Sequence, residues 1–123
     1  MKIITKSEAF HADKPEGISV DYYLFPEYEI HFNSQAPHTT QVWHHHQHIW
    51  ETIFILKGEL LVMWKQDGKE IHQLVTAGDV IETERTPHTF MNNSQNPAEF
   101  LVIKQILSGQ DKSALLKKDK VLD

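Results

Sequence analysis

Apolar and polar residues alternate in short runs along this chain, a pattern that predicts strands with one face toward a core. Between Ile18 and Ile106, β-branched and aromatic runs are separated by Pro, Gly, Asn and Asp. Their spacing of about ten residues is typical of a β-sandwich or barrel. Helical periodicity is nearly absent, so we expect an all-β fold of two facing sheets. The expected strands are residues 20–25, 28–32, 40–46, 51–56, 59–65, 70–75, 79–82, 88–92 and 99–106.

Turn signals divide these strands. Asp67-Gly68 predicts a tight hairpin turn, because this dipeptide readily adopts positive φ angles. Further turns are expected at residues 77–79 and 92–97. Ser108-Gly109 ends the strand pattern, and the remaining tail can either hold one helical turn around residues 114–116 or be a mobile terminus. We therefore expect a single domain over residues 1–123, with a barrel core at about 18–106 and a C-terminal tail at 107–123.

The expected strand 51–56 is apolar on both faces. Ile53 and Ile55 alternate with Phe54 and Leu56, so neither side of the strand reads as solvated. One face would line the barrel interior. The other must pack on another layer, on the N-terminal segment or on a neighbouring subunit, which favours a homodimer.

Charge and composition exclude several classes of partner. The 123 residues carry a formal net charge of -5, and the Lys and Arg residues are scattered, so no nucleic-acid or anionic-membrane surface is expected. No cysteine is present, which excludes disulfides and thiolate metal sites. No apolar stretch approaches the ~20 residues of a membrane span, and the first residues do not resemble a secretory signal. A cytoplasmic location is the expectation.

The segment 43–51 is rich in metal-binding side chains. His44 and His46 share one face of a strand, with Cα atoms about 7 Å apart, whereas His45 points to the opposite face. Glu51 begins an apolar strand, where an unpaired buried charge would be costly. With His88 from a distant strand, the set offers three imidazoles and a carboxylate. The alternative is a surface histidine cluster that binds metal adventitiously.

The spacing of these residues resembles the two motifs of the cupin superfamily. The first motif, Gly-x5-His-x-His-x3,4-Glu-x6-Gly, matches at His44, His46, Glu51 and Gly58. The second, Gly-x5-Pro-x-Gly-x2-His-x3-Asn, matches at the residues Gly78, His88 and Asn92. The resemblance implies a double-stranded β-helix, or jelly-roll barrel. It also implies one divalent transition metal per chain (Fe, Mn, Ni, Cu, Co or Zn), held by His44, His46, Glu51 and His88.

Two positions depart from the motifs. His38 stands where the first motif begins with glycine. Residues 84–87 replace the Pro-x-Gly element in a loop that is one residue shorter than the motif. The second departure moves the loop that delivers His88, so His88 is the ligand whose position depends most on the folded structure.

Other side chains are candidates for the surroundings of the metal. His48 is expected at the rim, with replacement of His46 as a ligand as the alternative, and Trp50 is expected next to Glu51. Glu82 and Glu84 would share a strand face, either in the cavity as acid, base or cation-binding groups or on a solvated edge. Asn92 would orient His88 through a hydrogen bond. Pocket size would depend on residues Ile53, Ile55, Val62, Phe90 and Val102.

Fold alone does not fix the reaction, because one barrel hosts many chemistries. A first-row metal with open positions would chelate a substrate that has adjacent oxygen atoms. This favours a metal-dependent oxygenase, or a related enzyme, that acts on a small oxygen-rich organic molecule, with Glu51 also serving as a base. The alternative is a small-molecule binding or sensing module without turnover. A sugar isomerase or epimerase is disfavoured, because similar cupins that epimerise nucleotide sugars use a metal-free His and Asp pair.

Overall fold

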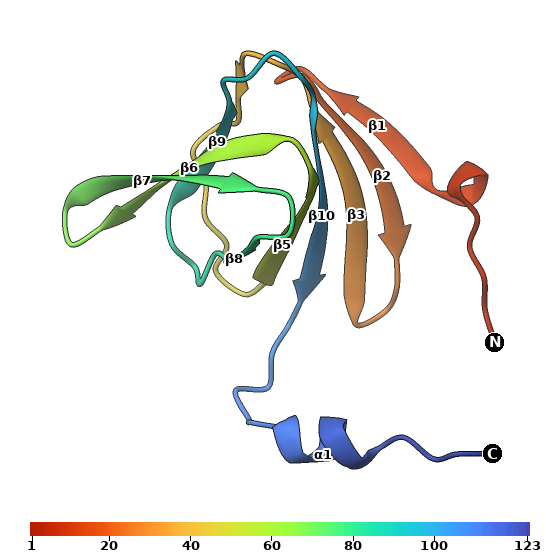
Figure 1. Ribbon diagram of the computed structural model, residues 1–123. Coiled ribbons are helices and arrows are strands. Elements are labelled where there is room, and N and C mark those ends of the chain that lie inside the picture. Colours follow the sequence, from red (N-terminus) through yellow and green to blue (C-terminus); the bar gives the residue numbers. More distant parts are fainter.

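Two antiparallel sheets face each other in the computed structural model, which describes residues 1–123 (Figure 1). The larger sheet has six strands in the order β1-β2-β3-β10-β5-β8. Its strands are β1 (Phe10–Lys14), β2 (Ile18–Leu24), β3 (Tyr28–Gln35), β10 (Ala98–Gln105), β5 (Trp50–Lys57) and β8 (Val80–Glu82). The smaller sheet has the order β4-β9-β6-β7. It consists of β4 (Thr39–Thr40), β9 (His88–Asn92), β6 (Glu59–Gln66) and β7 (Lys69–Thr76).

The core lies between the two inner faces. β10 is central to the larger sheet, and its alternate residues Phe100 and Val102 point inward beside Ile53 and Ile55 of β5. Phe90 of β9 meets them from the smaller sheet. Burying a side chain of this size contributes about 1.5–3 kcal/mol, so the facing rows hold the sheets together.

Two buried amides join the sheets at one end of the barrel. The Gln35 side chain, on β3, donates hydrogen bonds to the carbonyl oxygens of Thr39 and Phe90. The Asn92 side chain, on β9, donates to the carbonyl oxygens of Gln35 and Asn96. Both amides are fully buried, and their hydrogen bonds to backbone carbonyls satisfy the buried amide groups.

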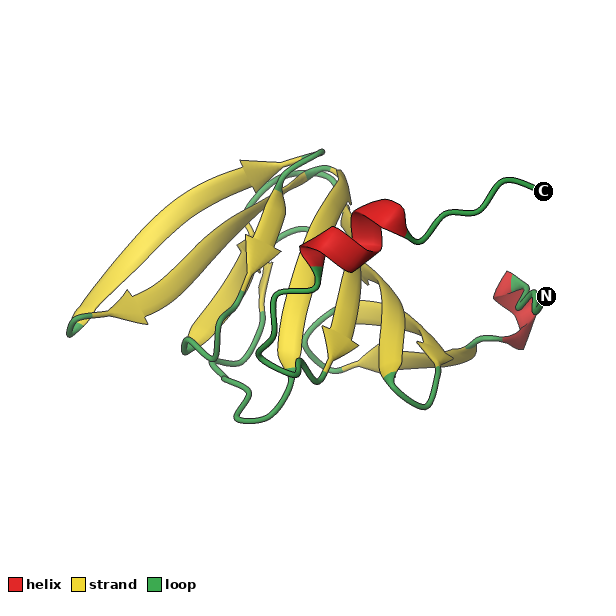
Figure 2. Ribbon diagram, turned by 90° about the horizontal axis from the view of Figure 1, so that it is seen from below, coloured by secondary structure: helices red, strands yellow, loops and turns green.

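Both termini lie outside the two sheets (Figure 2). A 3₁₀ turn at Lys6–Glu8 precedes β1, and α1 (Ser113–Lys118) follows β10 after an irregular segment. This helix confirms the turn expected around residues 114–116, and all its residues are exposed. No helix is both long enough and apolar enough to cross a bilayer.

The strand predictions were right for most elements and wrong for two. The expected strand over 40–46 does not form, because only Thr39 and Thr40 pair with β9, and His44 makes an isolated bridge to His88. The missed strand is β1, which pairs with β2 ahead of the expected core. Its sequence, Phe-His-Ala-Asp-Lys, holds one large apolar residue, and four of its five residues are exposed at the edge of the sheet.

Gly58 offers a test of the turn between β5 and β6. Its φ is +79°, and an added Cβ would lie 2.8 Å from the Pro97 carbonyl oxygen. Gly78 has a φ of +93° but open space around the same position. We expect Gly58→Ala to lower the free energy of unfolding by about 2–4 kcal/mol and Gly78→Ala by about 1–2 kcal/mol. Urea unfolding measures both, and equal losses would contradict the close approach to Pro97.

Candidate metal centre

The four predicted ligands come from three segments that converge inside the barrel. His44 and His46 lie on the irregular segment between β4 and β5, Glu51 is the second residue of β5, and His88 begins β9. The His44 ring centre lies 4.5 Å from that of His88 and 5.5 Å from that of His46. Paired backbone hydrogen bonds between His44 and His88, of 3.0 and 2.9 Å, join the two motifs.

Glu51 stands at the centre of this cluster. The ligand atoms of His44, His46 and Glu51 all lie within 4.8 Å of one another. Glu51 Oε2 is 3.2 Å from His46 Nε2, and Glu51 Oε1 is 3.5 Å from His88 Nε2. His44, His46 and Glu51 therefore form the group that could hold one metal, and His88 lies beside it with Nε2 near the Glu51 carboxylate.

The ring orientations of two histidines are set by backbone carbonyls. His44 Nδ1 lies 2.8 Å from the Val42 oxygen, and His88 Nδ1 lies 2.6 Å from the Thr86 oxygen. A carbonyl only accepts hydrogen bonds, so each Nδ1 carries a proton and each Nε2 is directed away from that carbonyl. Such hydrogen bonds fix the tautomer and ring orientation of metal-binding histidines.

The electrostatics keep Glu51 ionised. It is only 4% exposed, and burial by itself raises the pKa of a carboxyl. The neighbouring His88, Lys104 and His46 outweigh that effect, so the pKa of Glu51 lies below its ordinary value. Burial lowers the pKa of His46. A carboxylate and a neutral imidazole are the protonation states that metal binding requires.

One atom of the cluster has no partner in the protein. His88 Nε2 is fully buried and makes no hydrogen bond. Leaving a buried polar atom unpaired costs about 1–3 kcal/mol, so this nitrogen indicates a missing partner. Imidazole nitrogen and carboxylate oxygen together suit a first-row divalent metal. The residues present therefore fit the metal that the sequence implies.

A cavity of about 300 Å³ opens beside the cluster. Of the residues expected to set its size, Ile53, Phe90 and Val102 line it, whereas Ile55 and Val62 do not. Its polar lining includes the ligands His44, His46 and Glu51 and also the residues Lys14, Glu16, His31, Asn33, Gln41 and Lys104.

Sequence reasoning missed Asn33 and Lys104. Lys104 follows Val102 by two residues and is opposite Glu51 in the pairing of β10 with β5. The alternation that placed Val102 inward could have placed Lys104 there too. Asn33 had no such signal, because an asparagine in a strand normally reads as a surface or turn residue.

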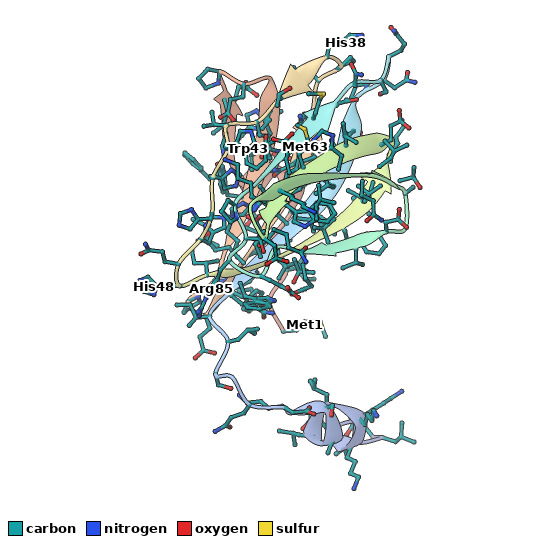
Figure 3. All side chains as sticks on the ribbon, turned by 90° about the vertical axis from the view of Figure 1, so that its left-hand side faces the viewer. Met1, His38, Trp43, His48, Met63 and Arg85 are labelled. Carbon is teal, nitrogen blue, oxygen red and sulfur yellow. The ribbon has the colours of Figure 1, made fainter.

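The candidates for the surroundings lie outside the metal cluster. His48 is exposed on the loop before β5, at the outer edge of the barrel (Figure 3). The Trp50 indole and the Thr52 hydroxyl both donate to the Glu82 carboxylate. Glu84 does not share a strand face with Glu82, because β8 ends at Glu82 and Glu84 has a φ of 50° in the following turn. Both glutamates border a second cavity of about 520 Å³, which His88 and Phe90 also line.

Asn92 does not orient His88. The Asn92 amide donates to Gln35 and Asn96, and its oxygen accepts hydrogen bonds from Ser94. The expected hydrogen bond to His88 is therefore wrong, and the Thr86 carbonyl holds the ring instead.

The two departures from the motifs are accommodated by backbone conformation. His38 has a φ of +57°, in the left-handed region that the motif glycine would adopt without strain. Glu84 and Arg85 have φ angles of 50° and 62° in the shortened loop. The loop still brings His88 to the cluster.

Similar folds occur among solved structures of low sequence identity. A predicted oxalate decarboxylase from Thermotoga maritima has 20% identity and a TM-score of 0.72, over 86% of this chain and 100% of the other. The CENP-C cupin domain from Drosophila melanogaster has 19% identity and a TM-score of 0.73, over 84% and 80%. An RmlC-like cupin from Shewanella frigidimarina has 14% identity and a TM-score of 0.71, over 89% and 94%. These likenesses show the jelly-roll fold.

A search of curated protein sequences gave no match to this chain. The family model described as Cupin domain matches residues 30–104, which is more than half of the chain and includes all four predicted ligands. The chain therefore belongs to the cupin family.

Proposed function

We propose that the protein is a metal-dependent oxygenase, or a related enzyme, that acts on a small oxygen-rich organic molecule. One divalent first-row ion per chain would be held by His44, His46, Glu51 and His88. The observation that carries this proposal is the unpartnered, buried Nε2 of His88, which faces a carboxylate among imidazoles. A bound metal would supply Lewis acidity and, for Fe, Mn, Cu, Co or Ni, redox chemistry.

The residues of this chain have defined tasks in such a site. His44 and His88 direct Nε2 in orientations fixed by their carbonyl partners. Glu51 supplies the negative charge, and it is the buried carboxylate of the cavity, so it is also the candidate base. The neighbouring cavity gives a small substrate access to the cluster.

Binding without turnover is the second candidate function. It is favoured by the lowered pKa of Glu51, because a carboxylate held among His88, Lys104 and His46 is a weak proton acceptor. An isomerase or epimerase is less well supported, since the cluster is built from metal-binding groups. Dioxygen uptake in the presence of diketones or diols would support the oxygenase, whereas saturable binding without uptake would support the binding module.

A second copy of the chain is proposed as the partner of the outer face of the larger sheet. Outward residues Phe32, Leu101, Phe54 and Val80 form one row across β3, β10, β5 and β8. Phe54 and Val80 are 38% and 56% exposed. The continuity of this row over four strands fits a second copy of the same face, since an apolar row of this kind is costly in a monomer.

Metal content tests the site directly. We expect protein purified without a histidine tag to hold one metal per chain by elemental analysis. His88→Ala and Glu51→Gln should each weaken metal binding at least tenfold, because each removes a ligand, while His45→Ala should leave it unchanged, because His45 is exposed. Circular dichroism would check that the variants fold. Full metal content in both ligand variants would contradict the proposed site.

Metal removal should also change stability. A ligand that binds only the folded state at 100 times its Kd adds about 2.7 kcal/mol to the free energy of unfolding. We therefore expect a chelator to lower the Tm of the wild type and to have no effect on Glu51→Gln. A chelator-insensitive Tm in metal-containing wild type would place the metal outside the folded core.

The dimer has its own test. Phe54→Lys places a charge in the centre of the apolar row, so we expect it to halve the mass measured by light scattering. Lys57→Met, an exposed change near the end of the same strand, should leave the mass unchanged. A monomeric wild type would contradict the proposed dimer.

A further inference from the structure

Asn33 is a buried amide that the protein leaves unused. It lies on β3, is 8% exposed, and lines the cavity beside the metal cluster. Asn33 Oδ1 is fully enclosed and has no hydrogen-bond partner. Apart from His88 Nε2, no other buried side-chain atom in the protein is unpaired in this way. Because leaving a buried oxygen unpaired is costly, Asn33 indicates a ligand that donates a hydrogen bond inside the cavity.

Lys104 brings a positive charge into the same cavity. Its side chain is 24% exposed, and Nζ lies 3.8 Å from Glu51 Oε2. No other ion pair engages this ammonium group. The distance leaves a weak contact, and Glu51 already lies closer to the nitrogens of His46 and His88. Lys104 therefore lies near the cluster, but no carboxylate in the protein forms a close ion pair with it.

The charges of the cavity lining balance only without a metal. Lys14 and Lys104 are matched in number by Glu16 and Glu51. Glu16 is engaged at the rim, where it accepts a hydrogen bond from the Val42 amide. A divalent ion at Glu51 would leave the cavity with two uncompensated positive charges. Positive charge in a partly enclosed site is stabilised by a bound anion.

We propose that this cavity binds a small organic carboxylate that also carries a hydrogen-bond donor, with Lys104 anchoring the carboxylate and Asn33 Oδ1 accepting from the donor. This inference names the substrate class of the proposed metal site and rests on that proposal. The carbon skeleton would contact the apolar lining, which consists of Ile18, Val42, Ile53, Phe90, Phe100 and Val102. A volume of about 300 Å³ lies at the small end of ligand pockets and limits the ligand to a compact acid.

Three related probes separate charge from hydrogen bonding. Mandelate carries a carboxylate and a hydroxyl, mandelamide lacks the charge, and phenylacetate lacks the hydroxyl. In calorimetric titrations of metal-loaded protein, we expect mandelate to bind at least tenfold more tightly than mandelamide. Lys104→Met should remove most of this preference, because the anchoring charge is lost. Lys57→Met removes the same charge at an exposed site and should keep the preference.

Asn33 is tested by the second pair of probes. Asn33→Leu keeps a side chain of similar size but removes the acceptor. It should weaken the binding of mandelate at least fivefold and leave the binding of phenylacetate nearly unchanged, because only mandelate offers the hydrogen-bond donor. Equal losses for both acids would show a packing role and overturn the assignment of Asn33.

Metal content, measured on every sample, separates the two proposals. Metal-loaded wild type and Lys104→Met that bind mandelate equally would overturn the carboxylate site and leave the metal site intact. If the wild type holds no metal, the metal proposal fails. Glu51→Gln then tests the anion site alone, because the cavity lining of this variant has two lysines, Lys14 and Lys104, and only one glutamate, Glu16. Mandelate binding that depends on Lys104 in this background supports the site, and no binding overturns it.

Discussion

The ionised carboxylate of Glu51, buried between two sheets, is the constraint on which the rest of the site depends. Moving an unpaired carboxylate out of water is costly, and Glu51 has no backbone amide to compensate it. His46, His88 and Lys104 supply that compensation from the segment before β5, from β9 and from β10. Because the lowered pKa shows that compensation exceeds desolvation, the site is built to hold negative charge at neutral pH.

The fold positions these groups by pairing at two levels. The ladder between β10 and β5 places Lys104 opposite Glu51, so this part of the site is as rigid as the larger sheet. The histidines depend instead on one isolated bridge between His44 and His88, outside any ladder. Each of these residues also uses its ring to reach a carbonyl two residues earlier. Local hydrogen bonds thus fix the side-chain positions in the loops, as the ladder pairing fixes them in the strands.

Much of this arrangement could be predicted from the sequence, and the failures have physical causes. Alternation identified most strands, because one face of each is buried. The spacing from His44 to Glu51 indicated the metal site. The strand expected over 40–46 failed because local side-chain and bridge contacts replace ladder pairing there. Asn33 was missed because the expected strand ended at residue 32, and because β3 turns polar residues inward, against the usual alternation.

The same contacts imply an order in which charges can be neutralised. While Glu51 has only side chains around it, its negative charge offsets Lys104, and an incoming anion gains little from that lysine. If Glu51 bound a metal, the metal would neutralise its charge, and Lys104 would become available to an anion in the cavity. An anion bound there would in turn reduce repulsion between Lys104 and the metal. Such coupling is necessarily reciprocal, so each ligand of the site should raise the affinity for the other.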